Sequence, residues 1–152
     1  MKQGVKRAGK ALVLVLCSLL VACETPNFFP NWRIEVAPST SPDSDLKRLD
    51  ELAARHDFLP APLGRDLIDP DYDPVQMLRA YQLRDRRTLH LSIGWAMRHE
   101  RYFVFVTDIG HASLQLRGLE CRKYLDIVAD LTGVFGASNV VPSRMGTCDP
   151  TA

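Results

Sequence analysis

The chain has 152 residues, the length of one ordinary domain, and 46% of them are hydrophobic, which is enough to build a packed core. The formal net charge of +1 depends on four basic residues among the first 22, because without them 15 basic residues face 18 acidic ones, a net charge of −3. A mildly acidic domain is poorly suited to bind the phosphate backbone of nucleic acids, so we expect no nucleic-acid partner.

The first segment combines a basic stretch, residues 1–10, with an uncharged and mostly apolar stretch, residues 11–22. This order is typical of a secretory signal. The apolar stretch is about 12 residues long, whereas a permanent transmembrane helix needs roughly 20. A short buried helix, or an ordinary signal peptide with an incidental cysteine, would be the alternatives.

The apolar stretch ends in Leu20-Val21-Ala22-Cys23. This motif resembles the lipobox of bacterial lipoproteins, which has an aliphatic residue, a tolerant position, a small residue and then cysteine. The resemblance covers residues 1–23 and implies that the Cys23 thiol receives a diacylglycerol, that signal peptidase II cleaves after Ala22, and that the new amino terminus is usually acylated as well. Two or more acyl chains give a stable membrane anchor. We therefore expect a lipoprotein signal peptide at 1–22, a lipidated tether at 23–31 and a single small domain at 32–152.

Glu24 follows the cysteine. In Gram-negative lipoproteins an aspartate at this position is the usual signal for retention in the inner membrane. For a Gram-negative host, the resemblance therefore places the protein at the outer membrane, facing the periplasm. The expected location is the cell envelope, with the lipid on Cys23 as the membrane contact.

Two helices and several strands are predicted in the mature chain. Residues 32–38 alternate large apolar with charged side chains, as a half-buried strand does. A helix should follow Ser41, which is a good N-cap, with Pro42 in its first turn and acidic residues at its positive end. Residues 59–74 contain four prolines and a glycine and are predicted to be mostly loop.

The second half carries most of the strand signals. Residues 77–84 and 88–97 are predicted strands, and residues 102–110 are apolar on both faces, which favours a central strand. Leu89, Leu91, Ile93, Trp95 and Met97 should share one face of the second strand. A helix is predicted over 119–136, with Gly133 and Gly136 as stop signals. Its buried face should carry Cys121, Leu125, Val128, Leu131 and Phe135.

This order of elements predicts an α+β fold. Strands joined by short turns pair antiparallel, and helices can then cover one face of the sheet. We expect an antiparallel sheet of about four to five strands with two helices packed on one face, in a ferredoxin-like or related arrangement. A fold of this kind does not itself imply a function.

Cys121 and Cys148 are the thiols that remain when Cys23 is lipidated and residues 1–22 are removed. An even pair of cysteines in an exported domain is typical of a disulfide. The bond would attach the C-terminal residues to the second helix. Two free cysteines are the alternative.

Several polar residues could form a site. His90, His99 and His111 with Asp108 are a candidate zinc or acid–base site, although their spacing matches no known motif and isolated surface histidines are the simpler interpretation. The loop containing Asp69, Asp71 and Asp73 starts like a calcium loop, but it lacks the glycine and the glutamate that an EF-hand requires. We therefore predict no metal, no cofactor and no catalytic residue.

A basic cluster, Arg84, Arg86 and Arg87, flanks a predicted turn. It is either a solvated hairpin end or a contact for anionic lipid headgroups. Taken together, the sequence predicts a lipid-anchored envelope protein that acts as a non-catalytic binding module, with an envelope protein as a possible partner. A small periplasmic hydrolase or metal-binding protein that uses the histidine region is the alternative hypothesis.

Overall fold

The computed structural model of the chain describes residues 32–39, 41–64, 67–68, 74–109, 115–142 and 147–149. The predicted signal peptide, Cys23 with its tether, the aspartates at 69, 71 and 73, and His111 lie outside the described residues. Among the helices that are described, none is long and apolar enough to cross a membrane.

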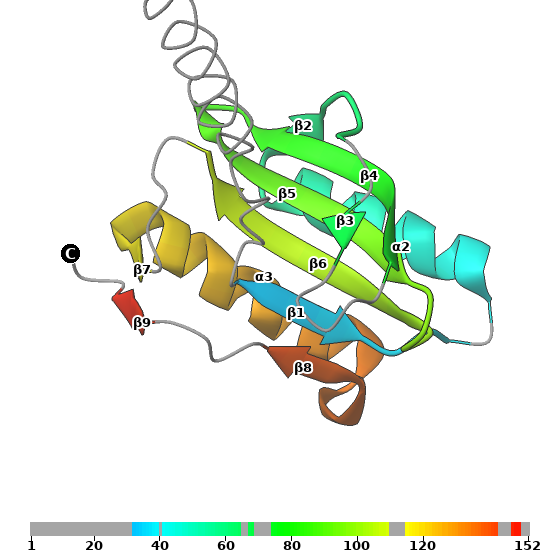
Figure 1. Cartoon of the computed structure of the whole chain (residues 1–152). Helices are drawn as coiled ribbons and strands as arrows, with labels where there is room; N and C mark the ends of the chain where they lie inside the picture. Colours follow the sequence, from blue (N-terminus) through cyan, green and yellow to red (C-terminus); the bar gives the residue numbers. More distant parts are fainter. Residues whose placement is uncertain are drawn as a thin grey trace, which may run out of the picture.

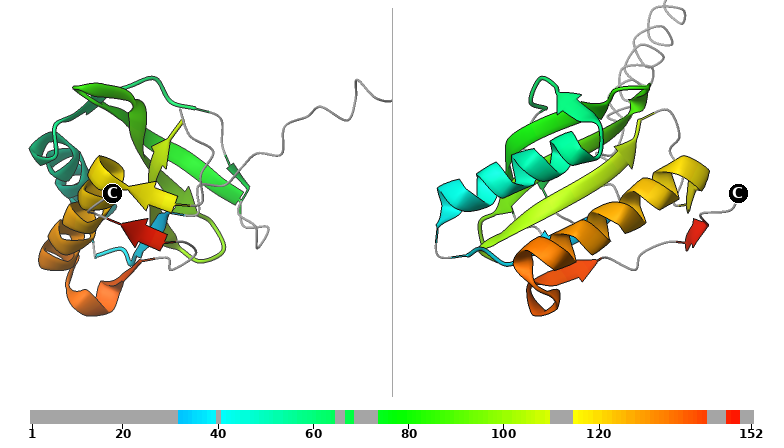
Figure 2. Two further views of the ribbon diagram at one scale, coloured as in Figure 1. Left: turned by 90° about the vertical axis from the view of Figure 1, so that its left-hand side faces the viewer. Right: turned by 180° about the vertical axis from the view of Figure 1, so that it is seen from behind.

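An antiparallel sheet and two helices form two layers (Figures 1 and 2). The sheet has the strand order β2-β4-β5-β6-β1-β8, and β3 pairs with β4 outside this path. The bounds are Arg33–Val36 for β1, Phe58–Pro60 for β2, Leu67–Ile68 for β3, Pro74–Leu83 for β4, Arg86–Ala96 for β5, Arg101–Asp108 for β6 and Val140–Pro142 for β8. The predicted α+β class is confirmed, with more strands than the expected four to five.

Both helices cover the same face of the sheet (Figure 2). Helix α2, Pro42–Arg55, connects β1 to β2, and helix α3, Gly118–Phe135, connects β6 to β8. Since β1 pairs antiparallel with both β6 and β8, the strands β6 and β8 run parallel to each other with β1 between them. This is a split β-α-β unit, in which the helix must cross over the intervening strand.

Helix α2 begins after Ser41, as predicted, but the Ser41 side chain makes no capping hydrogen bond. Asp45, in the first turn, instead binds the segment that precedes the helix. Its carboxylate is fully buried and accepts hydrogen bonds from the Ser39 backbone N–H at 2.8 Å and from the Ser39 hydroxyl at 2.6 Å. The helix ends at Arg55, and Asp57 turns the chain toward β2 with a φ of 64°. Asp45 therefore fixes how the chain enters α2.

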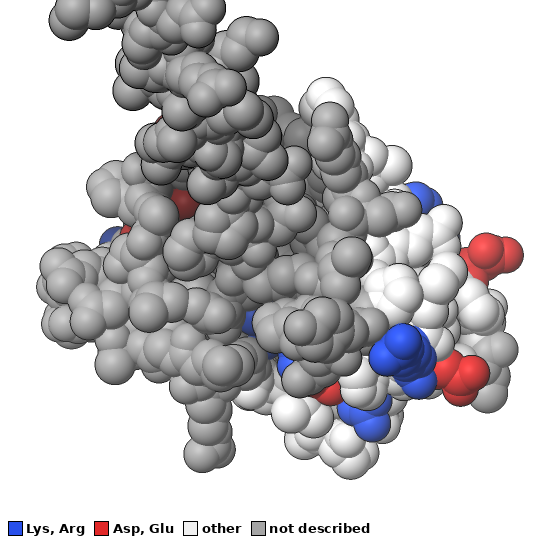
Figure 3. Space-filling view, viewed as in Figure 1, with Lys and Arg blue, Asp and Glu red and all other residues white. Residues whose placement is uncertain are grey.

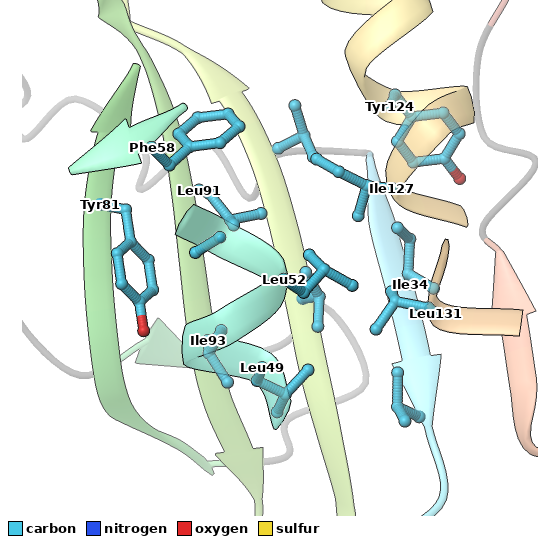
Figure 4. Packing of buried hydrophobic residues seen from close by; sticks show 14 of the residues in the cluster. Ile34, Leu49, Leu52, Phe58, Tyr81, Leu91, Ile93, Tyr124, Ile127 and Leu131 are labelled. Carbon is cyan, nitrogen blue, oxygen red and sulfur yellow. The ribbon is translucent and has the colours of Figure 1, made fainter. Parts of the chain in front are cut away.

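The main core lies between the helices and the sheet. Figure 4 shows Leu49 and Leu52 of α2 packed beside Leu91 and Ile93 of β5, while Ile127 and Leu131 of α3 face Ile34 of β1. All seven of these side chains are 0–1% exposed. Alternate residues of β1, β5 and β6 fill this core, which is what the predicted period of two requires.

Strand β6 is buried on both faces, as predicted for a central strand. Tyr102, Val104 and Val106 belong to the helix-side core. Phe103 and Phe105 point to the other face, where they form a second apolar cluster with Val75, Met77 and Ala96. The sheet therefore has packed side chains on both faces in its centre.

The buried face of α3 differs from the prediction. Cys121, Leu131 and Phe135 are buried as expected, but Leu125 is 45% exposed, and Tyr124 and Ile127 take its place in the core. In the middle of the helix the buried stripe therefore runs through positions 124 and 127 instead of 125 and 128. Gly136 follows the helix with a φ of 89°, which suits a stop signal, whereas Gly133 remains inside the helix.

The second predicted strand also ends earlier than expected. Leu89, Leu91 and Ile93 are buried on one face of β5, but Met97 lies in the following turn and is 54% exposed. Trp95 is half-buried and packs edge-on against Tyr102 with a centroid distance of 5.0 Å. The segment 59–74, predicted to be loop, contributes the short strand β3 and part of β2.

A disulfide joins Cys121 of α3 to Cys148, with their Cα atoms 5.2 Å apart. Cys148 lies in β9, Thr147–Asp149, which pairs parallel with β7, Gln115–Arg117. This two-stranded ribbon lies at the amino-terminal end of α3 (Figure 1). The bond thus holds the C-terminal strand beside the start of the second helix, the arrangement that the cysteine count suggested.

Candidate functional site

The structure does not bring the described members of the predicted histidine site together. His90 pairs with Thr107 and lies on the sheet face without helices, where its Nε2 is 3.1 Å from the Arg87 carbonyl oxygen. Asp108 pairs with Leu89 and points to the helix side, and His99 lies in the turn at the far end of β5. Among the described residues, no group of three or more histidine, cysteine, aspartate or glutamate side chains is placed to hold a metal ion.

Asp108 instead belongs to a charge cluster around Arg86. The Arg86 guanidinium lies 2.6 Å from the Asp108 carboxylate and also contacts the Glu120 carboxylate. The side chains of Asp108 and Glu120 are only 6% and 11% exposed. Arg86 therefore ties the start of β5 to the end of β6 and to the first turn of α3, so its role in the predicted basic cluster is structural.

Strand β4 contains an irregularity that shapes the surface beside α2. The register against β5 shifts between Met77 and Arg79, which leaves Leu78 as an extra residue. A bulge of this kind re-aims the side chains that follow it. Before the bulge, Met77 packs on the sheet face without helices, and after it Arg79 and Tyr81 lie on the helix side. The bulge thus brings polar side chains of β4 next to α2.

A groove with a volume of about 480 Å³ lies between α2, β2 and β4. Most of its lining is apolar, and it is open to solvent along one side. The lining residues are Asp50 and Ala54 of α2, Phe58 and Pro60 of β2, Ala61 and Leu63 just after it, and Leu78, Arg79, Ala80 and Tyr81 of β4. A volume of this size is within the range of ligand pockets in proteins.

Three polar side chains converge at one wall of the groove. The Tyr81 hydroxyl donates a hydrogen bond to Oδ1 of Asp50, and Arg79 Nε donates to the same oxygen at 3.2 Å. A second guanidinium nitrogen of Arg79 donates to the Leu78 carbonyl at 2.9 Å. Burial, together with the hydrogen bond to the Asp50 carboxylate, raises the pKa of Tyr81 well above its ordinary value. Tyr81 therefore stays protonated at neutral pH and acts as a hydrogen-bond donor.

The chemistry of this groove suits binding. Neither Asp50 nor Arg79 is deeply buried, since their side chains are 44% and 43% exposed, and their charges offset each other. Leu59 and Leu63 add exposed apolar surface on and just after β2, at 43% and 57% exposed. An apolar side chain could enter the groove while polar groups of the same ligand reach the Asp50–Arg79 pair.

The groove is not among the sites predicted from the sequence. Asp50 is separated from Arg79 by 29 residues and from Tyr81 by 31, so their proximity depends on how α2 packs against the sheet. One local signal was present: Arg79 interrupts a row of alternate apolar residues, Val75, Met77, Tyr81 and Leu83. A charged residue in such a row indicates a position where the strand is either solvent-exposed or bulged.

Comparisons of the chain with protein-family models, with curated proteins and with solved structures found no match.

Proposed function

We propose that this protein is a lipid-anchored lipoprotein of the cell envelope, attached through Cys23, whose folded domain is a non-catalytic binding module. The anchor is inferred from the basic stretch, the apolar stretch and the lipobox-like motif Leu20–Cys23. In a Gram-negative host the domain would face the periplasm from the outer membrane. The disulfide between Cys121 and Cys148 fits an oxidising compartment.

The groove between α2, β2 and β4 is the observation that supports a binding role. Its lining is mostly apolar, and the polar groups at its wall, Asp50, Arg79 and Tyr81, are engaged with one another. The described lining residues include no serine, cysteine or histidine, and their one hydroxyl, that of Tyr81, is kept protonated by burial and by its hydrogen bond to Asp50. We propose that the groove accepts an apolar side chain of an envelope protein, with Leu59 and Leu63 in the surrounding contact.

The anchor is tested by replacing Cys23 with serine. The Cys23→Ser chain should incorporate no labelled palmitate and should keep its signal peptide, which shows as slower migration on a gel. The control is Cys17→Ser, because Cys17 lies within the segment that processing would remove. Processing and palmitate labelling of Cys23→Ser equal to those of the wild type would refute the lipoprotein proposal.

The groove is tested by site-specific photo-crosslinking in cells. A photoreactive residue at Leu63, 57% exposed, should give a discrete crosslinked product with one envelope protein, whereas the same residue at Met97, 54% exposed, should not. Introducing Ala54→Trp, which fills the groove from an exposed position of α2, should remove that product. Equal products from positions 63 and 97, or a product that Ala54→Trp leaves unchanged, would contradict the proposal.

A further inference from the structure

The turn between β4 and β5 lies at the end of the sheet from which β1 starts. The backbone N–H of Val106 donates to the Trp32 carbonyl at 3.2 Å, and Val106 pairs with Leu91 of β5. Four residue steps along β5 lead from Leu91 to Arg87, which corresponds to about 13 Å along the strand. Because β1 runs antiparallel to β6, it leads away from this end of the sheet (Figure 1).

The proposed anchor is close enough to hold this end at the bilayer. Nine residue steps separate Cys23 from Trp32, and an extended chain of that length reaches at most about 30 Å. The turn at residues 97–100 lies at the opposite end of β5, so the anchored chain would have to fold back along the sheet to bring it to the surface. The anchor therefore favours the β4–β5 end over the opposite end.

The side chains at the β4–β5 end have the chemistry of a membrane contact. Arg84, Arg87 and Arg122 are exposed there, and the exposed acidic residues beside them are Asp85 of the turn and Asp57, whose carbonyl accepts from the Arg84 N–H. Arg122 belongs to this end because Arg86 contacts Glu120 and so holds the first turn of α3 against the turn. The acidic partners of Arg86 are buried, so the exposed charges of this set are three arginines and two aspartates.

An exposed apolar residue lies among these arginines. Ile109 follows β6 directly and is 67% exposed, and its backbone N–H donates to the Thr88 carbonyl at 2.8 Å. That bond places Ile109 beside Thr88, one residue from Arg87 along β5. Neighbouring strands of a sheet lie about 4.8 Å apart. Arginines around an exposed isoleucine can bind headgroup phosphates while the apolar side chain enters the interface.

We infer that the β4–β5 end, with Arg84, Arg87, Arg122 and Ile109, lies against anionic phospholipid headgroups of the membrane that holds the anchor. This inference rests on the proposed lipid anchor. Tethering makes even a weak contact effective, because it turns the second binding event into an intramolecular one. On the part of the described surface that is visible in Figure 3, blue and red side chains lie interspersed.

The test is arginine footprinting of the full acylated protein in vesicles. Phenylglyoxal modifies accessible guanidinium groups, and mass spectrometry measures the rate at each arginine. In vesicles that contain phosphatidylglycerol, compared with vesicles of phosphatidylcholine alone, modification of Arg84 and Arg87 should slow by about fivefold or more. Arg48 and Arg98, exposed residues of α2 and of the opposite turn, are the matched controls and should not change. High salt should remove the protection of Arg84 and Arg87.

A second variant separates this contact from other causes of protection. Arg84→Gln/Arg87→Gln should abolish the effect of phosphatidylglycerol on Arg122, whereas Arg48→Gln/Arg98→Gln should leave it unchanged. Equal modification of all four arginines in both vesicle types, or protection of the opposite end, would overturn the inference. The acyl mass on Cys23 is read in the same spectra: an unacylated protein would refute the proposed anchor, whereas an acylated protein without protection would refute the membrane contact alone.

Discussion

Gly94 lies in β5 on the sheet face without helices, where the second apolar cluster packs. A Cβ atom at this position would come closer than 3.0 Å to Cγ1 of Val75, and within 3.3 Å of both the Gln76 carbonyl oxygen and Met77 Sδ. Carbon atoms in contact normally lie about 3.5–4.0 Å apart, and the β-branched Val75 has few rotamers to escape into. Overpacking of this kind costs about 1–3 kcal/mol. Gly94→Ala should therefore lower the melting temperature by roughly 4–12 °C.

Gly133→Ala is a control that should change stability in the opposite direction. Gly133 is exposed in α3, and an added Cβ there would have no atom within 4 Å. Alanine is the better helix former, so Gly133→Ala should stabilise the domain by about 0.5–1 kcal/mol. Thermal and urea unfolding followed by circular dichroism measure both variants under the same conditions. The two substitutions make the same chemical change, so a difference in sign isolates the effect of packing.

A double variant identifies the atoms responsible. Val75→Ala removes the group that the new Cβ would strike, so Gly94→Ala/Val75→Ala should be less destabilised than the sum of the single variants, by about 1 kcal/mol or more. The predicted clash with Val75 is refuted if Gly94→Ala melts like the wild type. It is also refuted if the destabilisations by Gly94→Ala and Val75→Ala simply add in the double variant. It also fails if Gly133→Ala destabilises as much as Gly94→Ala.

Three further measurements test other parts of the structure. Cys148→Ser should destabilise the domain by about 3.5 kcal/mol, the chain-entropy value for a disulfide that closes 27 residues, and thiol trapping of the untreated wild type should find neither Cys121 nor Cys148 reactive. Burial raises the pKa of Tyr124 from 10.0 to about 12. The contribution of Tyr124 to stability is therefore complete below pH 10 and is lost as the pH rises toward 12. Spectrophotometric titration should show a phenolate that forms late and is absent in Tyr124→Phe. Asp45→Ala should cost about 1–2 kcal/mol in urea unfolding, because the N–H and hydroxyl of Ser39 lose their acceptor, whereas an effect below a few tenths would contradict this role.

The sequence predicted the elements whose signal is local. Strands β5 and β6 alternate or fill both faces over eight or more residues, so their type and position in the sheet followed from side-chain period alone. The start of α2 was predicted from Ser41 and Pro42. The role of Asp45, whose carboxylate accepts hydrogen bonds from Ser39, was not predicted, because Asp45 has the same pattern as any acidic residue in a first turn. Only the fold shows that the chain before the helix turns back over this carboxylate.

The face of α3 shows where periodicity is ambiguous. Positions 121, 125, 128 and 121, 124, 127 both follow helical spacing, and the choice depends on whether a tyrosine counts as apolar. Tyr124 packs edge-on against Trp32 at a centroid distance of 5.2 Å, so most of its surface behaves as a hydrophobe. Leu125 is left on the solvent side as a result. Periodicity could not predict the groove either, because the groove requires a bulge at Leu78 and the packing of α2 against β4.

The edges of the sheet favour a groove over strand addition as the way this domain meets a partner. Strands β2 and β8 end the strand order of the sheet, with the two-residue strand β3 also beside β4, and β2 and β8 each have three residues and end in proline, Pro60 and Pro142. Ala61 N–H donates to the Ala80 carbonyl at 2.8 Å, and the Asp57 carbonyl accepts from Arg84 N–H at 3.0 Å. The backbone N–H and C=O groups of the odd-numbered residues in this segment therefore point toward β4. Pro60 therefore faces outward, where it has no N–H to offer an added strand. An added strand would gain little from backbone pairing at this edge, which supports the proposal that a partner inserts a side chain into the apolar groove beside Pro60.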